Sequence, residues 1–328
     1  MMHRSFLFRL LGLLTVALSF ASAQAQDNPA KDFPDKPIHL IVCYAAGGAN
    51  DLVARVLGQK LTESLGQAVV VENKAGAAGA IGAAYAAQAK PDGYTLLFAP
   101  SAMFTANSVF FKKLPYSSSD FVPISMVVTF PYFIVVAPSQ PFQSVKDLAE
   151  YLKANPKKAN FSGAAGLNQM AFELFKSQTG TTGEYVPYKG TNRSVAAVMA
   201  GDVLMTIADA GGVASQLKGG QVRGLAVTSR ERAVTFPSIP TVAEAGYPGL
   251  QMGSWMGLLA PAGTPMPIVR KLQAEVNRIV KTADFKQRMN ALEVTPEGST
   301  SEEFGSFMTS ELARWLAVAK AANIQPTD

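Results

Sequence analysis

The sequence is poor in the residues that build most catalytic and metal sites. Its 328 residues include one cysteine, Cys43, and two histidines, His3 and His39. An internal disulfide, a C-x-x-C site and an H-E-x-x-H zinc site are therefore excluded. A histidine-based triad would require His39, but that residue lies in an apolar segment, 37–42, typical of a buried strand, and no G-x-S-x-G motif accompanies it. We expect no metal ion and no cofactor.

Charge is also scarce. Charged residues make up 16% of the chain and hydrophobic residues 48%, which excludes an intrinsically disordered protein. The 29 Lys and Arg residues exceed the 24 Asp and Glu residues only slightly, and they form no basic run. Nucleic acid is therefore not an expected partner. The length predicts roughly two domains.

The N-terminus has the pattern of a secretory signal peptide. Basic residues precede an apolar stretch at 10–21, and small residues then provide a cleavage motif ending at Ala23 or Ala25. The alternative, an N-terminal membrane anchor, would need about 20 apolar residues, and the stretch is much shorter. We interpret residues 1–25 as a signal peptide and expect an exported, periplasmic protein.

Short β-branched runs alternate with helical segments along the chain, which predicts an α/β protein with parallel or mixed sheets. Expected strands lie at 38–43, 69–72, 94–98, 132–137, 159–162, 184–187, 203–207, 223–228 and 255–260. Expected helices begin near Asp51, after Ser144, after Thr264-Pro265 and near Ser301, the last running past Trp315.

Loops that follow strands carry the most informative chemistry, because ligands of open α/β sheets bind there. The loops at 44–50, 74–79 and 162–168 consist mostly of small, uncharged residues and precede expected helices. Small residues let a ligand approach the backbone, and free N–H groups at a helix start favour an anion. None matches G-x-G-x-x-G or the P-loop, so a nucleotide is unsupported. Each loop could also be a tight turn; together they predict a small-anion pocket.

The order and spacing of several motifs now become recognisable. They are Pro37-Ile38-His39-Leu40-Ile41-Val42, Gly47-Gly48-Ala49-Asn50-Asp51, Ala54-Arg55, Val71-Glu72-Asn73-Lys74 with Gly76, Gly79 and Gly82, Pro91-Asp92-Gly93-Tyr94-Thr95-Leu96, Val186-Pro187-Tyr188-Lys189-Gly190, Leu225-Ala226-Val227-Thr228, Pro240-Thr241-Val242-Ala243-Glu244-Ala245-Gly246 and Ala260-Pro261-Ala262-Gly263-Thr264-Pro265. Over nearly the whole mature length the chain resembles the extracytoplasmic solute-binding proteins of tripartite tricarboxylate transporters, also called the Bug family.

The resemblance implies a two-lobed, type II periplasmic-binding fold of the α/β class that closes on its ligand. Since no linker is found, we expect the lobes to exchange strands, with crossings near 123–131 and 228–240. This places residues 26–125 and 238–328 in lobe 1 and residues 126–237 in lobe 2.

The function implied is that of a receptor, not an enzyme, that captures a small carboxylate. Dicarboxylates, tricarboxylates and aromatic carboxylates all fit this expectation, and the receptor would deliver its ligand to membrane transporter subunits while itself being a monomer. Two alternatives stay open: an exported hydrolase-like enzyme, and a ligand sensor without a transport role.

The resemblance also assigns ligand-binding positions in both lobes, where backbone amides and hydroxyls hold a carboxylate. In lobe 1 they are Tyr44, Ala46, Gly48, Asn50, Asp51, Asn73 and Ser101. In lobe 2 they are Ser162, Gly163, Ala164, Asn168, Gln169, Tyr188, Lys189, Gly190, Thr191 and Asp209.

Some of these positions have structural alternatives or depart from the family pattern. Asp51 could cap its helix, and Lys189 could be a solvated loop charge. Many relatives have proline where this chain has Cys43 and Ala75, and a histidine where it has Gln169. The aromatics Tyr44, Phe104, Tyr132 and Tyr188 suggest a ligand with an apolar body, unless they belong to the core.

Overall fold

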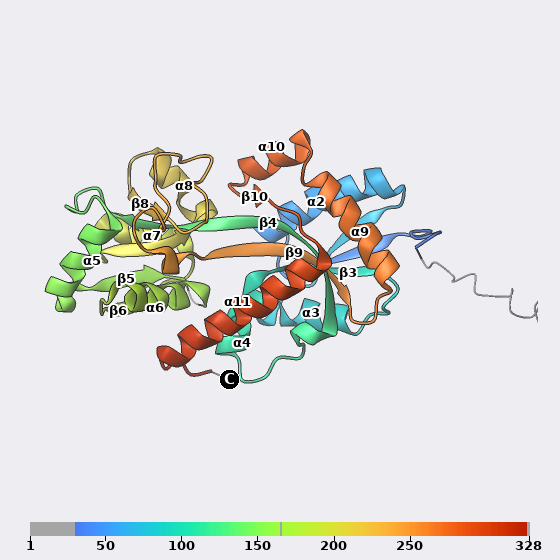
Figure 1. The fold of residues 1–328 in the computed structure, drawn as a ribbon, viewed down its shortest axis with the longest axis horizontal. Coiled ribbons are helices and arrows are strands. Elements are labelled where there is room, and N and C mark those ends of the chain that lie inside the picture. Colours follow the sequence, from blue (N-terminus) through green and yellow to red (C-terminus); the bar gives the residue numbers. More distant parts are fainter. Residues whose placement is uncertain (1–29, 165, 327–328) are drawn as a thin grey trace, which may run out of the picture.

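A computed structural model describes residues 30–164 and 166–326, so the predicted signal peptide lies outside the described residues. The strands form one extended mixed sheet in the order β2-β1-β3-β9-β4-β7-β5-β6, with β8 and β10 also paired to β4. The sheet runs along the long axis of the molecule and helices cover both of its faces (Figure 1). Among the described residues, no helix combines the length and apolarity that crossing a membrane requires.

The first half of the sheet joins three parallel strands to two antiparallel ones. Strands β1 (Ile38–Val42), β2 (Val69–Asn73) and β3 (Thr95–Pro100) are parallel, and β9 (Gly253–Pro261) pairs antiparallel to β3 and to β4 (Phe121–Val136).

Side chains alternate between the two faces of these strands, as the strand period requires. Leu40 packs beneath α2 (Ala49–Leu65), α9 (Met266–Ile279) and α10 (Ala283–Ala291), whereas Ile41 faces α3 (Ala80–Ala87) and α11 (Ser301–Ala321). The strand is buried as expected, but His39 is exposed and its Nδ1 pairs with Glu72. His39 therefore has a surface partner, in contrast to the buried position that its apolar neighbours predict.

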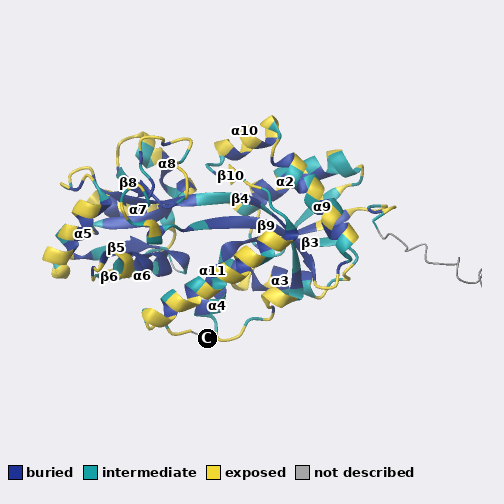
Figure 2. Ribbon diagram, viewed as in Figure 1, coloured by how far each residue is buried: buried dark blue, intermediate teal, exposed yellow. Residues whose placement is uncertain are grey.

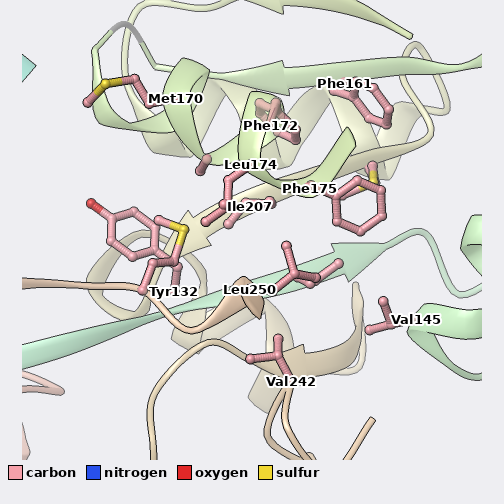
Figure 3. Close-up of a cluster of buried hydrophobic side chains, with 14 of the residues drawn as sticks. Tyr132, Val145, Phe161, Met170, Phe172, Leu174, Phe175, Ile207, Val242 and Leu250 are labelled. Atoms are coloured by element: carbon pink, nitrogen blue, oxygen red, sulfur yellow. The ribbon is translucent and has the colours of Figure 1, made fainter. Parts of the chain in front are cut away.

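The second half of the sheet is built in the same way. Strands β5 (Asn160–Gly163), β6 (Glu184–Pro187) and β7 (Met205–Asp209) are parallel, and β4 runs antiparallel between β7 and β8 (Arg223–Val227). Helices α5 (Val145–Ala154) and α6 (Leu167–Thr179) pack on one face, and α7 (Thr191–Ala200) and α8 (Ala210–Lys218) on the other. Figure 3 shows the cluster on the α6 face, where the rings of Phe161, Phe172 and Phe175 meet Ile207 and Leu250.

Two long strands connect the halves. Residues 121–131 of β4 pair with β9 in the first half, and residues 132–136 pair with β7 and β8 in the second. The segment 123–131, expected as a crossing, is thus the first part of a 16-residue strand. Residues of the following return segment, Val242 and Leu250, are still buried in the second half's core.

Helix α11 also spans the two halves. Phe304 and Met308 in its first turns pack with Trp255 in the first half, while Trp315 and Ala319 pack in the cluster of α6. Its start is fixed by a capping box, in which the Thr300 hydroxyl accepts from the backbone of Glu303 and the Glu303 carboxylate accepts from Thr300 N–H.

Each strand expected from the sequence is present, and the shorter elements complete the chain. The remaining elements are α4 (Ala106–Phe110), the two-residue strand β10 (Thr295–Pro296) and the 3₁₀ turns η1 (Ala77–Gly79), η2 (Ser101–Met103), η3 (Ser118–Asp120), η4 (Pro156–Lys158) and η5 (Pro248–Leu250). Figure 2 shows the sheet buried between helices that expose only their outer faces.

Candidate functional site

The topology gathers the predicted ligand-binding residues at two sheet edges. Strands β1, β2 and β3 are parallel, so the loop 44–50, Asn73 and Ser101 all lie at their carboxyl ends. Strands β5, β6 and β7 are also parallel, and residues 162–169, residues 188–191 and Asp209 lie at their carboxyl ends. Such edges are where open α/β sheets bind ligands.

A hydrogen-bond network around Asp51 fixes the first loop. The Asp51 carboxylate is 2% exposed and accepts from Gly47 N–H (2.9 Å), Arg55 Nε (2.9 Å) and Asn73 Nδ2 (2.9 Å). Asn73 also donates to the Tyr44 carbonyl at 3.0 Å. Burial disfavours the charged form of Asp51, but these hydrogen bonds and the Arg55 charge outweigh it and hold its pKa below the ordinary value.

This network assigns Asp51 and Asn73 a structural task within the loop. Gly47, with φ of +84°, makes a turn that a side-chain-bearing residue rarely adopts, and its N–H bond to Asp51 secures that turn. The backbone at 45–49 is exposed, including Ala46 and Gly48. The part of the loop left for a ligand is therefore its backbone and the first N–H groups of α2.

Two further residues of this loop differ in their surroundings. Tyr44 is half-buried, its hydroxyl reaches the Ala78 carbonyl at 3.4 Å, and burial raises its pKa to about 12. Asn50 lies in the first turn of α2, and its buried Oδ1 has no hydrogen-bond partner. Buried acceptors without a donor are uncommon. Asn50 is thus a candidate contact for a donor group on a ligand.

Polar residues from the two halves approach each other at the crossing strands. Ser101, at the end of β3, bonds through Oγ to Ser254 Oγ on β9 at 2.7 Å. Ser254 pairs with Phe130, two residues before the buried Tyr132, and Tyr132 lies opposite Asp209 in the β4–β7 pairing. The site residues Ser101 and Asp209, from opposite halves, therefore lie close to one shared position of the crossing strands.

In the second half, the 162–169 loop is held by internal contacts. Ser162 Oγ donates to the Ser194 carbonyl at 3.0 Å, and Asn168 Nδ2 donates to the Ile207 carbonyl at 2.7 Å. The Ala164 carbonyl accepts a short hydrogen bond from the Tyr185 hydroxyl. These side chains position the loop, and half-buried Gln169 on the first turn of α6 follows them.

The loop before α7 is more open. Lys189 and Gly190 are exposed, and Tyr188 is half-buried against the core of α7 and α8. The Thr191 hydroxyl donates to Asp209 Oδ2 at 2.7 Å, while Asp209 Oδ1 accepts from Gly212 N–H at 2.9 Å and caps α8. Both carboxylate oxygens of Asp209 thus accept hydrogen bonds from protein donors.

Three helices at these edges begin without a side-chain cap. Helices α2, α6 and α7 start after Gly48, Gly166 and Gly190, and no side chain caps any of them. Ser144, Asp209, Thr282 and Thr300 cap α5, α8, α10 and α11, whereas α3, α4 and α9 also begin without a side-chain cap. Uncapped first-turn N–H groups at the positive end of a helix dipole are suited to bind a carboxylate.

Two of the aromatics expected near a ligand belong to the core instead. Phe104 is 3% exposed and stacks on Trp255 with ring centroids 6.2 Å apart. Tyr132 is 6% exposed and packs in the α6 cluster. The sequence could not distinguish them from ligand-facing rings, because both follow or begin a strand at the correct edge. Of the four aromatics, Tyr44 and Tyr188 are the ones that stay half-buried at the sheet edges.

The structure also contains a cavity that the sequence did not suggest. It has a volume of about 750 Å³ and lies between the loop after β8 and the region of β10, beside the crossing strands. Phe133, Ala210, Trp255, Glu293 and Arg314 are among the lining residues. None of the predicted ligand-binding residues lines it. The one feature of the sequence that marks this cavity is the run of charged residues at 230–232, which lie in its wall.

The two halves, each with its own core, and the strands that cross between them define a two-lobed α/β binding protein of the type II periplasmic class. The chain belongs to the tripartite tricarboxylate transporter family of receptors, whose family model matches residues 53–324.

Relatives extend over almost the whole chain. A protein encoded in the tcbD-tcbE intergenic region of Pseudomonas sp. strain P51 is 34% identical over 94% of this chain and 92% of its own length. Protein BugT of Bordetella pertussis is 34% identical over 95% of this chain and 97% of its own length.

Solved structures agree in fold. Rpa4515 of R. palustris with adipate has a TM-score of 0.75 at 32% identity, covering 90% of this chain and 100% of that one. MatC of Rhodopseudomonas palustris with bound malate has a TM-score of 0.69 at 30% identity, covering 87% and 99%. A TctC solute-binding protein from Polaromonas has a TM-score of 0.80 at 27% identity, covering 88% and 99%.

Proposed function

We propose that this chain is a periplasmic receptor that binds a small dicarboxylate between its lobes and delivers it to membrane transporter subunits. The observation that supports the proposal is that three of the predicted ligand loops lead into glycine-started helices without a side-chain cap, α2 from the first lobe and α6 and α7 from the second. Their free N–H groups would hold carboxylate oxygens without a cationic side chain. Relatives with bound adipate and malate support this class of ligand.

The lobes of this receptor follow from the packing. We place residues 30–131 and 253–326 in the first lobe and the residues between them in the second, because the β4 and β9 pairings change at Pro131 and Gly253. Leu250 and Met252 belong to the second lobe's core. This moves the second boundary downstream of residue 237, the last lobe 2 residue expected from the sequence.

A receptor of this kind would release its ligand unchanged. We propose that the protein acts as a monomer and not as an enzyme. His39, the one histidine after residue 29, is exposed on β1 and paired with Glu72. Its position on the strand, away from the carboxyl edge, gives the site no imidazole base. Export through the N-terminal segment 1–25 would bring the receptor to its partner.

Gly48 provides the direct test. A side chain there meets only the Ala45 carbonyl, at 3.6 Å from the Cβ position, so a substitution leaves the fold intact while covering the first N–H groups of α2. Gly48→Val should reduce adipate and malate affinity at least tenfold by calorimetry. Gly305→Val, in α11, is the control and should retain affinity. Equal affinity in both variants would contradict binding at α2.

Gly163 is unsuitable for the same experiment. A Cβ atom there would lie 2.9 Å from Asn168 Cβ and 3.0 Å from the Tyr185 ring. Substituting Gly163 would therefore distort the loop itself, and a loss of binding would not distinguish a blocked ligand from a displaced backbone.

A further inference from the structure

Glu293 occupies an unusual backbone position where α10 ends. Its φ is +56°, in the left-handed region, and its N–H donates to the Asn290 carbonyl at 3.1 Å. Glycine is the residue that adopts this conformation most easily at a helix end. Glutamate is disfavoured here by backbone conformation, so its side chain is the feature that distinguishes this position.

The Glu293 carboxylate bonds to the opposite lobe. Its Oε1 accepts from Lys218 Nζ at 2.7 Å, and its Oε2 accepts from the Thr235 hydroxyl at 2.6 Å. Lys218 ends α8 in the second lobe, whereas α10 packs in the first-lobe core through Phe285 and Met289. One side chain therefore joins the lobes through two charge-assisted bonds.

The contact lies between the lobes, where it can affect the angle between them. Glu293 and Thr235 both line the 750 Å³ cavity between the lobes, with Pro131 and Gly253 of the crossing strands also in its wall. The cavity leaves the lobes room to move relative to each other. The Glu293 side chain is 12% exposed and that of Lys218 56%, so one end of the ion pair is shielded from solvent while the other is screened.

A second connection lies on α11. The Arg314 side chain donates to the Gly249 carbonyl of the second lobe at 3.1 Å, and Trp315 packs in that lobe's core. Figure 1 shows α10 and α11 on opposite sides of the two crossing strands. The crossing strands are thus flanked by α11 on one side and by the Glu293 contact on the other.

We infer that Glu293, with Lys218 and Thr235, is an interlobe strut that restricts the angle between the lobes. A contact that favours one arrangement of a two-state hinge changes the population of the other, and with it the apparent ligand affinity. The strut lies outside the predicted ligand site. It requires the two-lobed fold but not the proposed ligand.

Distance measurements between spin labels test the strut without any ligand. Labels are placed at Gln88→Cys in the first lobe and Lys157→Cys in the second, both exposed positions. The native Cys43 is fully buried and burial raises its pKa to about 12, so it is not labelled. Double electron-electron resonance then gives the distribution of the interlobe distance.

Glu293→Gln and Lys218→Met should each broaden or split the distribution of the interlobe distance. The ratio of the populations of the two hinge arrangements should change roughly fivefold. Lys60→Met is the matched control, because Lys60 bonds Glu63 and Asp284 within one lobe, both at 3.0 Å. The exchanged pair Glu293→Lys with Lys218→Glu should narrow the distribution again. A distribution unchanged in Glu293→Gln would overturn the strut, whereas failure of adipate to bind would count only against the proposed function.

Discussion

Asp51 holds the loop 44–50, the first of the predicted ligand loops, by bonding to three separate parts of the chain. Its carboxylate bonds to the Gly47 backbone, to Arg55 one helical turn later and to Asn73 at the end of β2. Removing the charge leaves these donors with weaker partners in a buried place. The loop that exposes the α2 N-terminus therefore depends on an interaction that does not itself require a ligand.

Asp51→Asn should lower the free energy of unfolding by about 2 kcal/mol near neutral pH, measured by urea denaturation. Because the folded-state pKa of Asp51 is below its unfolded value, its contribution is present above the unfolded pKa and is lost as pH falls through the folded one. The difference between variant and wild type should therefore shrink in acid. The exposed Asp202→Asn is the control, and a gap that grew in acid would contradict the assignment.

A substitution of Lys189 tests whether a side-chain cation binds the ligand carboxylate. It is exposed on the loop before α7, beside the uncapped N-terminus. If N–H groups hold the ligand, Lys189→Met should weaken adipate binding less than tenfold in calorimetry. A loss much larger than that of Gly48→Val would instead assign the carboxylate to the ammonium group.

The residue types at the loops predicted which residues the fold brings together at the carboxyl ends of the strands, but not what each side chain does there. Asp51 was predicted with two open roles, and its partner Asn73 is distant in sequence, so their bond could not be deduced from spacing. The pairing of Ser101 with Ser254 spans an even larger separation. Long-range polar contacts of this kind depend on the register of the sheet, which the sequence pattern does not specify.

At the scale of elements, α11 is the helix that links the lobes outside the sheet. Trp315 is 1% exposed and packs in the second lobe, although the helix begins in the first. The Trp315 indole N–H donates to the buried Glu311 carboxylate at 3.2 Å. Burial raises the pKa of Glu311. A change at Trp315 should thus affect an interlobe contact as well as a core.

Trp315→Ala should lower stability by about 3 to 5 kcal/mol in denaturant unfolding, through the loss of a fully buried ring. Leu316→Ala on the next position is the control, since Leu316 is 45% exposed, and it should change stability by less than about 0.5 kcal/mol. Similar losses in the two variants would show that α11 is not anchored as described.

The elements show what periodicity can and cannot predict. The strand at 132–137 was expected, but the preceding segment 123–131 was expected only as a crossing between lobes, and the structure makes it part of the same strand from Phe121. The structure accommodates Pro123 at a register shift in the β4–β9 pairing, where a missing N–H is tolerated. The two-residue strand β10 was too short to give any period.

For the whole molecule, two crossing strands and flanking helices make lobe closure the expected response to a ligand. Small-angle scattering with saturating adipate should therefore show a smaller radius of gyration than without it. The control is the same titration on Gly48→Val, which should not become compact. An unchanged radius in a wild-type protein that binds adipate would contradict closure while leaving the receptor role intact.

The central claim, capture of a small carboxylate without turnover, is tested most directly by calorimetric titration of the mature wild-type protein. The panel is adipate, malate, citrate and benzoate, followed by recovery and chemical analysis of the ligand. We predict one-to-one binding of at least one dicarboxylate, which is recovered unchanged. Absence of binding by every member of the panel, or conversion of the bound acid into another compound, would contradict the account.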